Sequence, residues 1–235
     1  MRFNIRESLL YLTLRLLVRL DRRVRDLASY DPEKVEHILL VSSTALGDTV
    51  LSTAAMVAIR QRFASARITA LIHRDYLPLF QSADFLDRLV PYHGGYRGFF
   101  QTVVALRREK PDIALVLHGN EPQATPLAYL AGAPFIIKLP NSSRFAFLLS
   151  NQTPRLDWAD LGHGMQQRLK VAALAGASIE GVRMHLAVRE EALNQVSQWL
   201  AVAGVNSQDV IIGFQAGASS GGRRVGALGP HAPPP

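Results

Sequence analysis

Cysteine is absent from the 235 residues of the sequence. The absence excludes disulfide bonds, metal sites built on thiolates and a cysteine nucleophile, and it is compatible with a reducing compartment. The sequence also lacks a membrane span in its most apolar segment, residues 1–28, because Arg15 and Arg19 interrupt the apolar run and a span needs about 20 predominantly apolar residues. No small-residue cleavage site of the secretory type ends that segment. We therefore expect a cytoplasmic protein.

Two common nucleotide-binding signatures are missing as well. The loop over residues 43–48, STALGD, holds one glycine, so the G-x-G-x-x-G fingerprint of dinucleotide binding is absent. The loop over residues 217–224, GASSGGRR, lacks the lysine and hydroxyl residue that end a Walker motif. Its N–H groups, hydroxyls and guanidiniums nevertheless suit a diphosphate. From these residues alone, an anion site and a plain linker are equally good interpretations.

The composition provides apolar material for a core and an excess of positive charge. Hydrophobic residues make up 48% of the chain, the formal net charge is +7 and the isoelectric point is about 10.1. At this length the chain supports one large domain, or one and a part. The charge indicates an anionic partner, without distinguishing nucleic acid, acidic lipid and phosphorylated sugar.

The N-terminal arm, residues 1–31, is predicted to be a basic amphipathic helix. Its first 28 residues hold seven arginines, three acidic residues and twelve Leu, Ile, Val or Phe residues. One interpretation places the helix in the membrane interface, with arginines on anionic headgroups. The other packs it on the body of the protein, with arginine stems covering apolar surface. Nucleic-acid binding ranks below both, because the arm lacks the polar and aromatic interleaving of such surfaces.

Residues 37–150 alternate predicted strands with predicted helices. The strands are Ile38–Val41, Arg67–His73, Leu89–Tyr92, Ile113–His118 and Phe135–Leu139. The helices are Asp48–Phe63, Tyr76–Ser82, Arg97–Arg108 and Gln123–Ala131. Such alternation is typical of an α/β fold built on a doubly wound parallel sheet.

Residues 151–208 are predicted to be a connector. It begins with a polar loop and continues with a helix over Met165–Ala175, a short strand over Met184–Val188 and a helix over Glu190–Ala203. Glycines after both helices mark their ends.

Residues 209–224 predict the beginning of another domain. A buried strand over Asp209–Phe214 opens into the loop of residues 217–224. The tail of residues 225–235, VGALGPHAPPP, has no hydrophobic period and can neither continue a sheet nor begin a helix. We expect a truncated or frame-shifted product.

Asp48 is the strongest candidate for chemistry, because it lies where the first strand of the domain gives way to a helix. Parallel sheets bind ligands at the carboxyl ends of their strands. A carboxylate in the first helical turn also suits capping, which is worth roughly 0.5–2 kcal/mol whatever the function. From the spacing alone, capping is the commoner role.

The segment from His37 to Phe63, HILLVSSTALGDTVLSTAAMVAIRQRF, resembles the start of glycosyltransferase family 9, the ADP-heptose:lipopolysaccharide heptosyltransferases, whose first strand leads into a G-x-x-GD type turn. Three later segments are similar to the family in the same order. They are PDIALVLHGN at Pro111–Asn120, HGMQQRLKVAALAGA at His163–Ala177 and IIGFQAGASSGGRR at Ile211–Arg224. The first and last motifs are the specific ones. The chain departs from the family at Thr44, where many members have glycine, and at Val225, where tryptophan and proline usually follow.

The resemblance implies a GT-B fold, in which two Rossmann-like domains face a cleft. Residues 37–150 would form the acceptor domain, and most of the C-terminal donor domain would be missing. Family enzymes are inverting and use no metal or other cofactor. The acid of the GD turn is their general base, which makes Asp48 the implied catalytic residue.

The resemblance also implies binding residues. Ser219, Ser220 and Arg223 match positions that contact the donor diphosphate. His118 and Asn120 are candidates for the acceptor site, although polar loop residues more often satisfy their own backbone.

The implied function is transfer of a heptose or similar sugar from a nucleotide sugar to a lipopolysaccharide core or related glycan. The acceptor would be phosphorylated and lipid-anchored, and the basic arm suits work at the inner membrane face, with an anionic membrane surface as a further partner. Because the part that would hold adenine and ribose is lacking after Arg224, we expect this chain to be an inactive fragment. The alternative is a non-catalytic membrane-surface binding protein that uses the arm. No nucleic-acid partner is expected.

Overall fold

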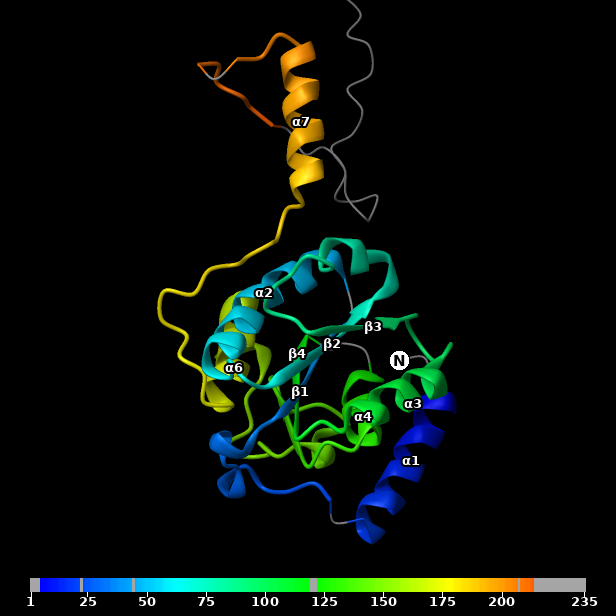
Figure 1. Ribbon diagram of the computed structural model, residues 1–235. Helices are drawn as coiled ribbons and strands as arrows, with labels where there is room; N and C mark the ends of the chain where they lie inside the picture. Colours follow the sequence, from blue (N-terminus) through cyan, green and yellow to red (C-terminus); the bar gives the residue numbers. More distant parts are fainter. Residues whose placement is uncertain (1–4, 22, 44, 119–121, 207, 214–235) are drawn as a thin grey trace, which may run out of the picture. The chain divides into compact units, whose positions relative to one another are not determined.

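A computed structural model describes residues 5–21, 23–43, 45–118, 122–206 and 208–213 (Figure 1). The chain divides into two compact units, Met1–Val188 and Arg189–Pro235. The first unit contains the sheet and the candidate site, and the second contributes one described helix, α7 (Glu190–Val202).

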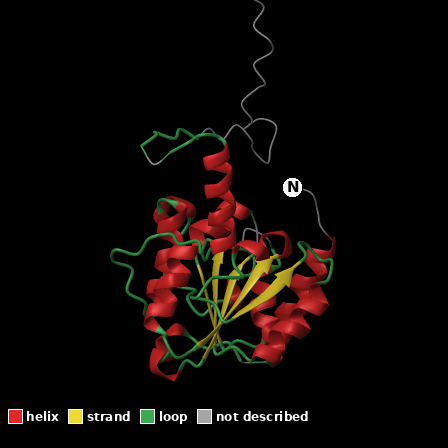
Figure 2. Ribbon diagram, turned by 45° about the horizontal axis from the view of Figure 1, so that its top comes forward, coloured by secondary structure: helices red, strands yellow, loops and turns green. Residues whose placement is uncertain are grey.

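The first unit is built on five parallel strands in the order β3-β2-β1-β4-β5. Their bounds are β1 (His37–Ser42), β2 (Arg67–His73), β3 (Arg88–Tyr92), β4 (Ile113–His118) and β5 (Phe135–Lys138). Figure 2 shows the arrows side by side, pointing the same way between layers of helices. The predicted doubly wound parallel sheet is therefore confirmed. The strand order reverses between β1 and β4, so the topological switch point lies between these two strands.

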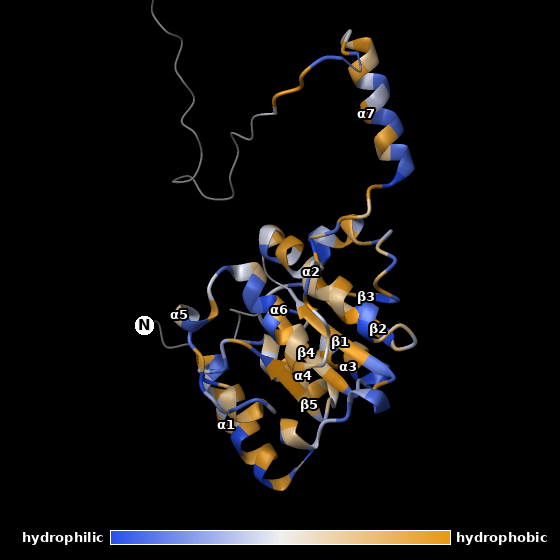
Figure 3. Cartoon of the chain, turned by 90° about the vertical axis from the view of Figure 1, so that its left-hand side faces the viewer, coloured by the Kyte–Doolittle hydropathy of each residue, from blue (hydrophilic) through white to orange (hydrophobic). Residues whose placement is uncertain are grey.

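Helices cover both faces of the sheet. One face carries α2 (Leu46–Arg62) and α6 (Gly164–Leu174), and the other carries α1 (Ile5–Leu20), α3 (Phe99–Glu109) and α4 (Ala124–Ala131) (Figure 1). Alternate residues of each strand enter opposite cores, as the pleat requires. In β1, Ile38 and Leu40 pack toward α2, whereas Leu39 and Val41 pack toward α4. Figure 3 shows the resulting hydrophobic colour along the strands. The central strands are therefore apolar on both faces, as their sequences predict.

The N-terminal arm is less helical than predicted for residues 1–31. Helix α1 ends at Leu20, and two short 3-10 helices, η1 (Leu27–Ser29) and η2 (Pro32–Lys34), follow. The helix stops there because the carboxylate of Asp21 accepts a hydrogen bond from the backbone N–H of Arg23, and Asp26 then caps η1. Local side-chain bonds to the backbone replace the helical ones.

Three more short helical segments are present: η3 (Arg74–Leu79) follows β2, η4 (Ala146–Leu148) follows β5, and α5 (Trp158–Leu161) lies in the connector. The predicted helices of the connector are present as α6 and α7. Both predicted strands after residue 180 are wrong over the described residues. Met184–Val188 is an irregular segment in which His185 N–H donates to Thr53 Oγ1 of α2 at 3.0 Å. Val210–Gly213 is also irregular and exposed, and Phe214 lies outside the described residues. Neither segment has a neighbouring strand among the described residues. A strand that has no neighbour leaves its backbone N–H and C=O groups unpaired, so neither segment forms a strand.

Candidate active site

Asp48 lies in the first turn of α2, directly after the carboxyl end of β1. The N-cap residue of this helix is Ala45, which makes no side-chain capping bond. The Asp48 carboxylate does not cap the helix either. Its Oδ1 accepts a hydrogen bond from Arg168 Nη2 at 2.9 Å, and Oδ2 lies 3.4 Å from His118 Nε2. Among the described residues, the partners of the Asp48 carboxylate are therefore side chains and not the backbone N–H groups of the helix.

Arg168, which bonds Asp48, comes from α6, 120 residues later in the chain. Its side chain is only 2% exposed. Nε donates to Ser52 Oγ at 3.0 Å, and Nη1 donates to the carbonyl oxygen of Gly164. The guanidinium donates hydrogen bonds to three different acceptors, and these bonds fix its position. The guanidinium therefore also fixes the position of Asp48 Oδ1.

Ser52 connects this network to the helix and the strand. Its Oγ accepts from Arg168 and from Ser42 Oγ at 3.0 Å, and donates to the backbone oxygen of Asp48 at 2.9 Å. All of its bonding capacity is used. The buried side of Asp48 therefore lies on a rigid hydrogen-bonded support.

His118 is the last residue of β4 and is 5% exposed. Burial and the positive charge of Arg168 lower its pKa from 6.5 to about 4, against the opposing effect of Asp48. The imidazole is therefore neutral at pH 7. A neutral imidazole offers one donor and one acceptor, which suits a hydroxyl-bearing ligand.

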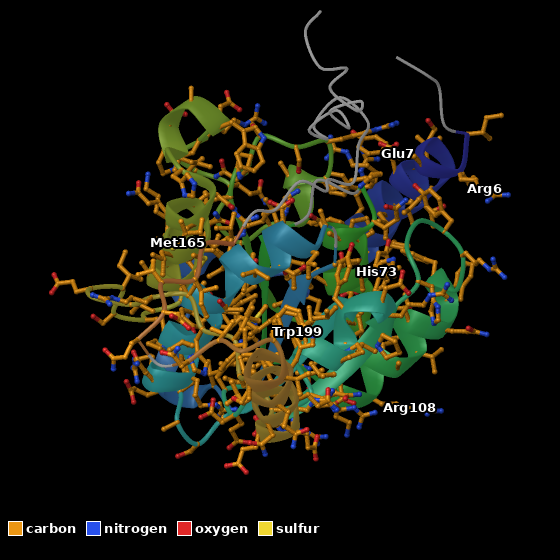
Figure 4. The ribbon with its side chains drawn as sticks, turned by 90° about the horizontal axis from the view of Figure 1, so that it is seen from above. Arg6, Glu7, His73, Arg108, Met165 and Trp199 are labelled. Atoms are coloured by element: carbon orange, nitrogen blue, oxygen red, sulfur yellow. The ribbon has the colours of Figure 1, made fainter. Side chains whose placement is uncertain are left out.

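These side chains meet at the carboxyl edge of the sheet. Figure 4 views this edge from above, with Met165, in the first turn of α6, on the side opposite Arg6 and Glu7 of α1, and His73, at the end of β2, between them. Asp48 follows β1 and His118 ends β4, and these two strands flank the switch point where open sheets bind ligands. The Asp48 side chain is 37% exposed. A half-exposed carboxylate beside a neutral imidazole is equipped to accept a proton from a ligand hydroxyl.

The remaining predicted site residues, Asn120, Ser219, Ser220 and Arg223, lie outside the described residues. Arg168 is a site residue that sequence reasoning missed. It shares the buried stripe of α6 with Val171 and Ala172, and an arginine on an apolar stripe is a signal that was available in the sequence. Among the described residues, no group of three or more His, Cys, Asp or Glu side chains is arranged to hold a metal ion.

No protein-family model and no curated protein sequence matches the chain. Solved structures do match. The glycosyl transferase family 9 structure from Veillonella parvula DSM 2008 is 21% identical over 80% of this chain, with a TM-score of 0.64. The fold is that of glycosyltransferase family 9. The E. coli ADP-heptose lps heptosyltransferase II structure is 20% identical over 78% of the chain (TM-score 0.60), and E. coli heptosyltransferase WaaC with ADP-2-deoxy-2-fluoro heptose is 13% identical over 72% (TM-score 0.51). The chain spans 55% of the length of each of the first two. The expected Rossmann-like domain of the GT-B type is confirmed as a fold.

Proposed function

We propose that this chain is the acceptor-binding part of an inverting glycosyltransferase that moves a heptose, or a similar sugar, from a nucleotide sugar to a glycan acceptor. The observation that supports this most is the Asp48 carboxylate, half-exposed and held by a buried arginine at the switch point of a family 9 fold. The matched E. coli structure named above holds an ADP-sugar analogue, which supports a nucleotide sugar as donor.

In the proposed reaction Asp48 is the general base. Its Oδ2 takes the proton of an acceptor hydroxyl while that oxygen forms a bond to the anomeric carbon of the donor sugar. The bond from that carbon to the nucleotide diphosphate breaks, and the configuration inverts. Arg168 binds Oδ1 and leaves Oδ2, which lies 3.4 Å from His118 Nε2, as the oxygen that takes the proton. The imidazole of His118 orients the hydroxyl.

The leaving diphosphate needs N–H or cationic partners for its charge. We assign this role to Ser219, Ser220 and Arg223, following the resemblance of the loop at residues 217–224. No metal or other cofactor enters the proposed reaction.

The surface of helix α1 is consistent with the proposal that the acceptor is phosphorylated, lipid-anchored and located at the inner membrane face. Leu14 is fully buried in the core of the first unit, so one side of the helix packs on the body. The opposite side of the helix exposes an apolar stripe whose members are 59–86% exposed, namely Ile5, Leu9, Leu12, Leu16 and Leu20. Arg6, Arg15 and Arg19 are exposed as well. Leucines flanked by arginines suit the interface of an anionic membrane.

None of the described helices is both long and apolar enough to cross a membrane. We propose that α1 lies on the cytoplasmic membrane surface with its stripe in the acyl boundary. The same stripe favours the second candidate function, a non-catalytic membrane-surface binding protein. The two candidate functions differ in the role of Asp48, which is needed for sugar transfer and not for binding to a membrane surface.

The test is sugar transfer by a fusion that continues residues 1–213 with the second half of E. coli heptosyltransferase II. We expect Asp48→Asn to lower kcat by about 10²–10⁴-fold, the usual contribution of a general base. Asp75→Asn is the matched control, because Asp75 is also an acid in the first turn of a helical segment after a strand and is 63% exposed. Normal turnover by the folded Asp48→Asn fusion would remove Asp48 from the mechanism. Normal acceptor binding without transfer in any fusion would favour the binding protein.

A further inference from the structure

A small cavity of about 190 Å³ is lined by His118, whose Nε2 also lies 3.4 Å from Asp48. Its polar lining consists of His118, Lys138, Ser142, Ser143, Trp158 and Gln167. The lining comes from the ends of β4 and β5, the loop after β5, α5 and α6. The volume suits one small group of a larger ligand, because whole-ligand pockets are typically about 300–1,000 Å³.

Lys138 places a buried positive charge at this cavity. It is the last residue of β5 and is 8% exposed. Its backbone is fixed by the side chain of Asn151, which accepts from the Lys138 N–H at 3.2 Å and donates to its carbonyl oxygen at 2.9 Å. Within the part of the chain that the structure describes, Nζ has no hydrogen bond or ion pair. A buried charge without a partner is costly, so an anion bound beside Lys138 would lower that cost.

Two further buried atoms of the lining lack partners among the described residues. They are Ser143 Oγ, which can donate, and Gln167 Oε1, which can only accept. The amide of Gln167 is oriented by its Nε2, which donates to the carbonyl oxygens of Leu117, at 3.3 Å, and Leu139. The hydroxyl of Ser142 is already bonded to Asp157. The cavity therefore presents a cation, a free hydroxyl and a free acceptor.

We propose that this cavity binds the anionic group of a hydroxylated acid, a carboxylate or a phosphate, with Lys138 as its counter-charge. Ser143 donates to the anion, and Gln167 Oε1 accepts from a neighbouring ligand hydroxyl. Because His118 lines the cavity and also lies 3.4 Å from Asp48, an anion held here places the adjoining part of the same ligand at Asp48. Identifying that ligand as the acceptor rests on the proposed function. The binding of an anion does not.

Trp158 provides a reporter for the test, because it lines the cavity and the chain has only one other tryptophan, Trp199. In a Trp199→Phe chain, Trp158 fluorescence is titrated with inorganic phosphate and, separately, with glycolate, a hydroxy-carboxylate, against chloride at constant ionic strength. We expect a saturable change with at least one of the two anions. Their relative affinities then distinguish a phosphate from a carboxylate ligand.

We expect Lys138→Met to weaken anion binding at least tenfold and Ser143→Ala to weaken it about threefold. Lys110→Met, which removes an exposed lysine after α3, is the matched control and should bind normally. The proposal is overturned if neither anion gives a saturable change, or if folded Lys138→Met responds like the parent. These results do not involve turnover, so a failure here leaves the role of Asp48 standing, and a failure of Asp48 in transfer leaves the anion site standing.

Discussion

The carboxyl edge of the sheet and helix α1 both depart from the usual rule that apolar side chains are buried and charged ones exposed, but they do so in opposite ways. The edge buries charged and polar side chains, with Arg168 at 2%, His118 at 5% and Lys138 at 8% exposure. Helix α1 instead exposes leucines, with Leu12 at 59% and Leu16 at 62%. The sheet between them is apolar on both faces and follows the usual rule.

This difference indicates that the carboxyl edge and helix α1 are both binding surfaces, each for a different kind of partner. Buried charge and exposed apolar surface both cost free energy in the isolated protein. At the edge, the charges are held in fixed positions that suit a small polar ligand. On α1, the apolar residues form an unbroken stripe that suits a surface. The two regions therefore predict opposite responses to substitution.

The largest expected change in stability comes from Arg168→Met. It leaves Asp48 Oδ1, Ser52 Oγ and the carbonyl of Gly164 without their donor. Removing one partner of a buried pair typically costs 3–5 kcal/mol, and we expect about 3 because Asp48 is partly solvated. Urea unfolding measures the change, with Arg108→Met on the exposed end of α3 (Figure 4) as a control that should shift stability by no more than about 0.5 kcal/mol. A loss below about 1 kcal/mol for Arg168→Met would mean that the support of Asp48 is not structural.

His118 should make the folded protein sensitive to acid. Its pKa is lowered from 6.5 to about 4, so between these values the unfolded chain binds a proton that the folded protein does not. Stability is complete above pH 6.5 and falls as the pH drops through the window, by up to about 3 kcal/mol. Unfolding free energies at pH 7, 6, 5 and 4 should show this slope, and His118→Asn should flatten it. An equal slope in His118→Asn would contradict the account, and the exposed-residue variant His93→Asn should retain the slope.

Lys138→Met should stabilise the protein while removing anion binding. Burial lowers the pKa of Lys138 from 10.5 to about 8, so at pH 7 the folded protein carries a charge in an unfavourable place. Replacing it with an apolar side chain of similar length should add about 1–3 kcal/mol. In the parent chain, stability should rise as the pH increases from 8 to 10.5, because only the unfolded chain then retains the proton. Thermal unfolding of both chains at pH 7 and pH 10 tests this, and a destabilised Lys138→Met would contradict it.

The smallest change in stability is expected for the double variant Leu12→Ser/Leu16→Ser, because both side chains are exposed. Its unfolding free energy should stay within about 0.5 kcal/mol of the parent. Binding to phosphatidylglycerol vesicles should fall more than tenfold, since each buried leucine contributes about 1.5–3 kcal/mol. Leu79→Ser/Leu174→Ser, at 44% and 38% exposure elsewhere on the unit, is the control that should still bind. Unchanged sedimentation of the α1 variant would exclude the stripe as a membrane surface.

Much of the sheet could be predicted from the sequence, because its strands are short apolar runs such as Ile113–His118. Asp48 could be predicted from its place after the first of them. Its neighbours could not, since the pairing of β1 with β4 depends on strand order, which no local pattern encodes. Two neighbours of the site did leave a signal in the sequence, because each is a basic residue within an apolar pattern. They are Arg168, on the buried stripe of α6, and Lys138, at the end of the run Phe135–Ile137.

The two strand predictions after residue 180 failed because a strand-like pattern is present where no partner strand is available among the described residues. Met184–Val188 is a short, mostly apolar run like that of a strand, but such a pattern alone does not provide a partner strand. A strand is stable only beside another, and here the backbone N–H of His185 bonds to a threonine of α2 instead.

The central claim is that a glycan acceptor binds at the carboxyl edge of β1, β4 and β5. The most direct test is to titrate this chain with a deacylated lipopolysaccharide core oligosaccharide while recording histidine side-chain NMR signals. His118 and His37 lie at opposite edges of the same sheet, at the end of β4 and the beginning of β1. The account predicts saturable shifts of the His118 signals with His37 unchanged. No saturable shift at His118, or equal shifts at both residues, would contradict it.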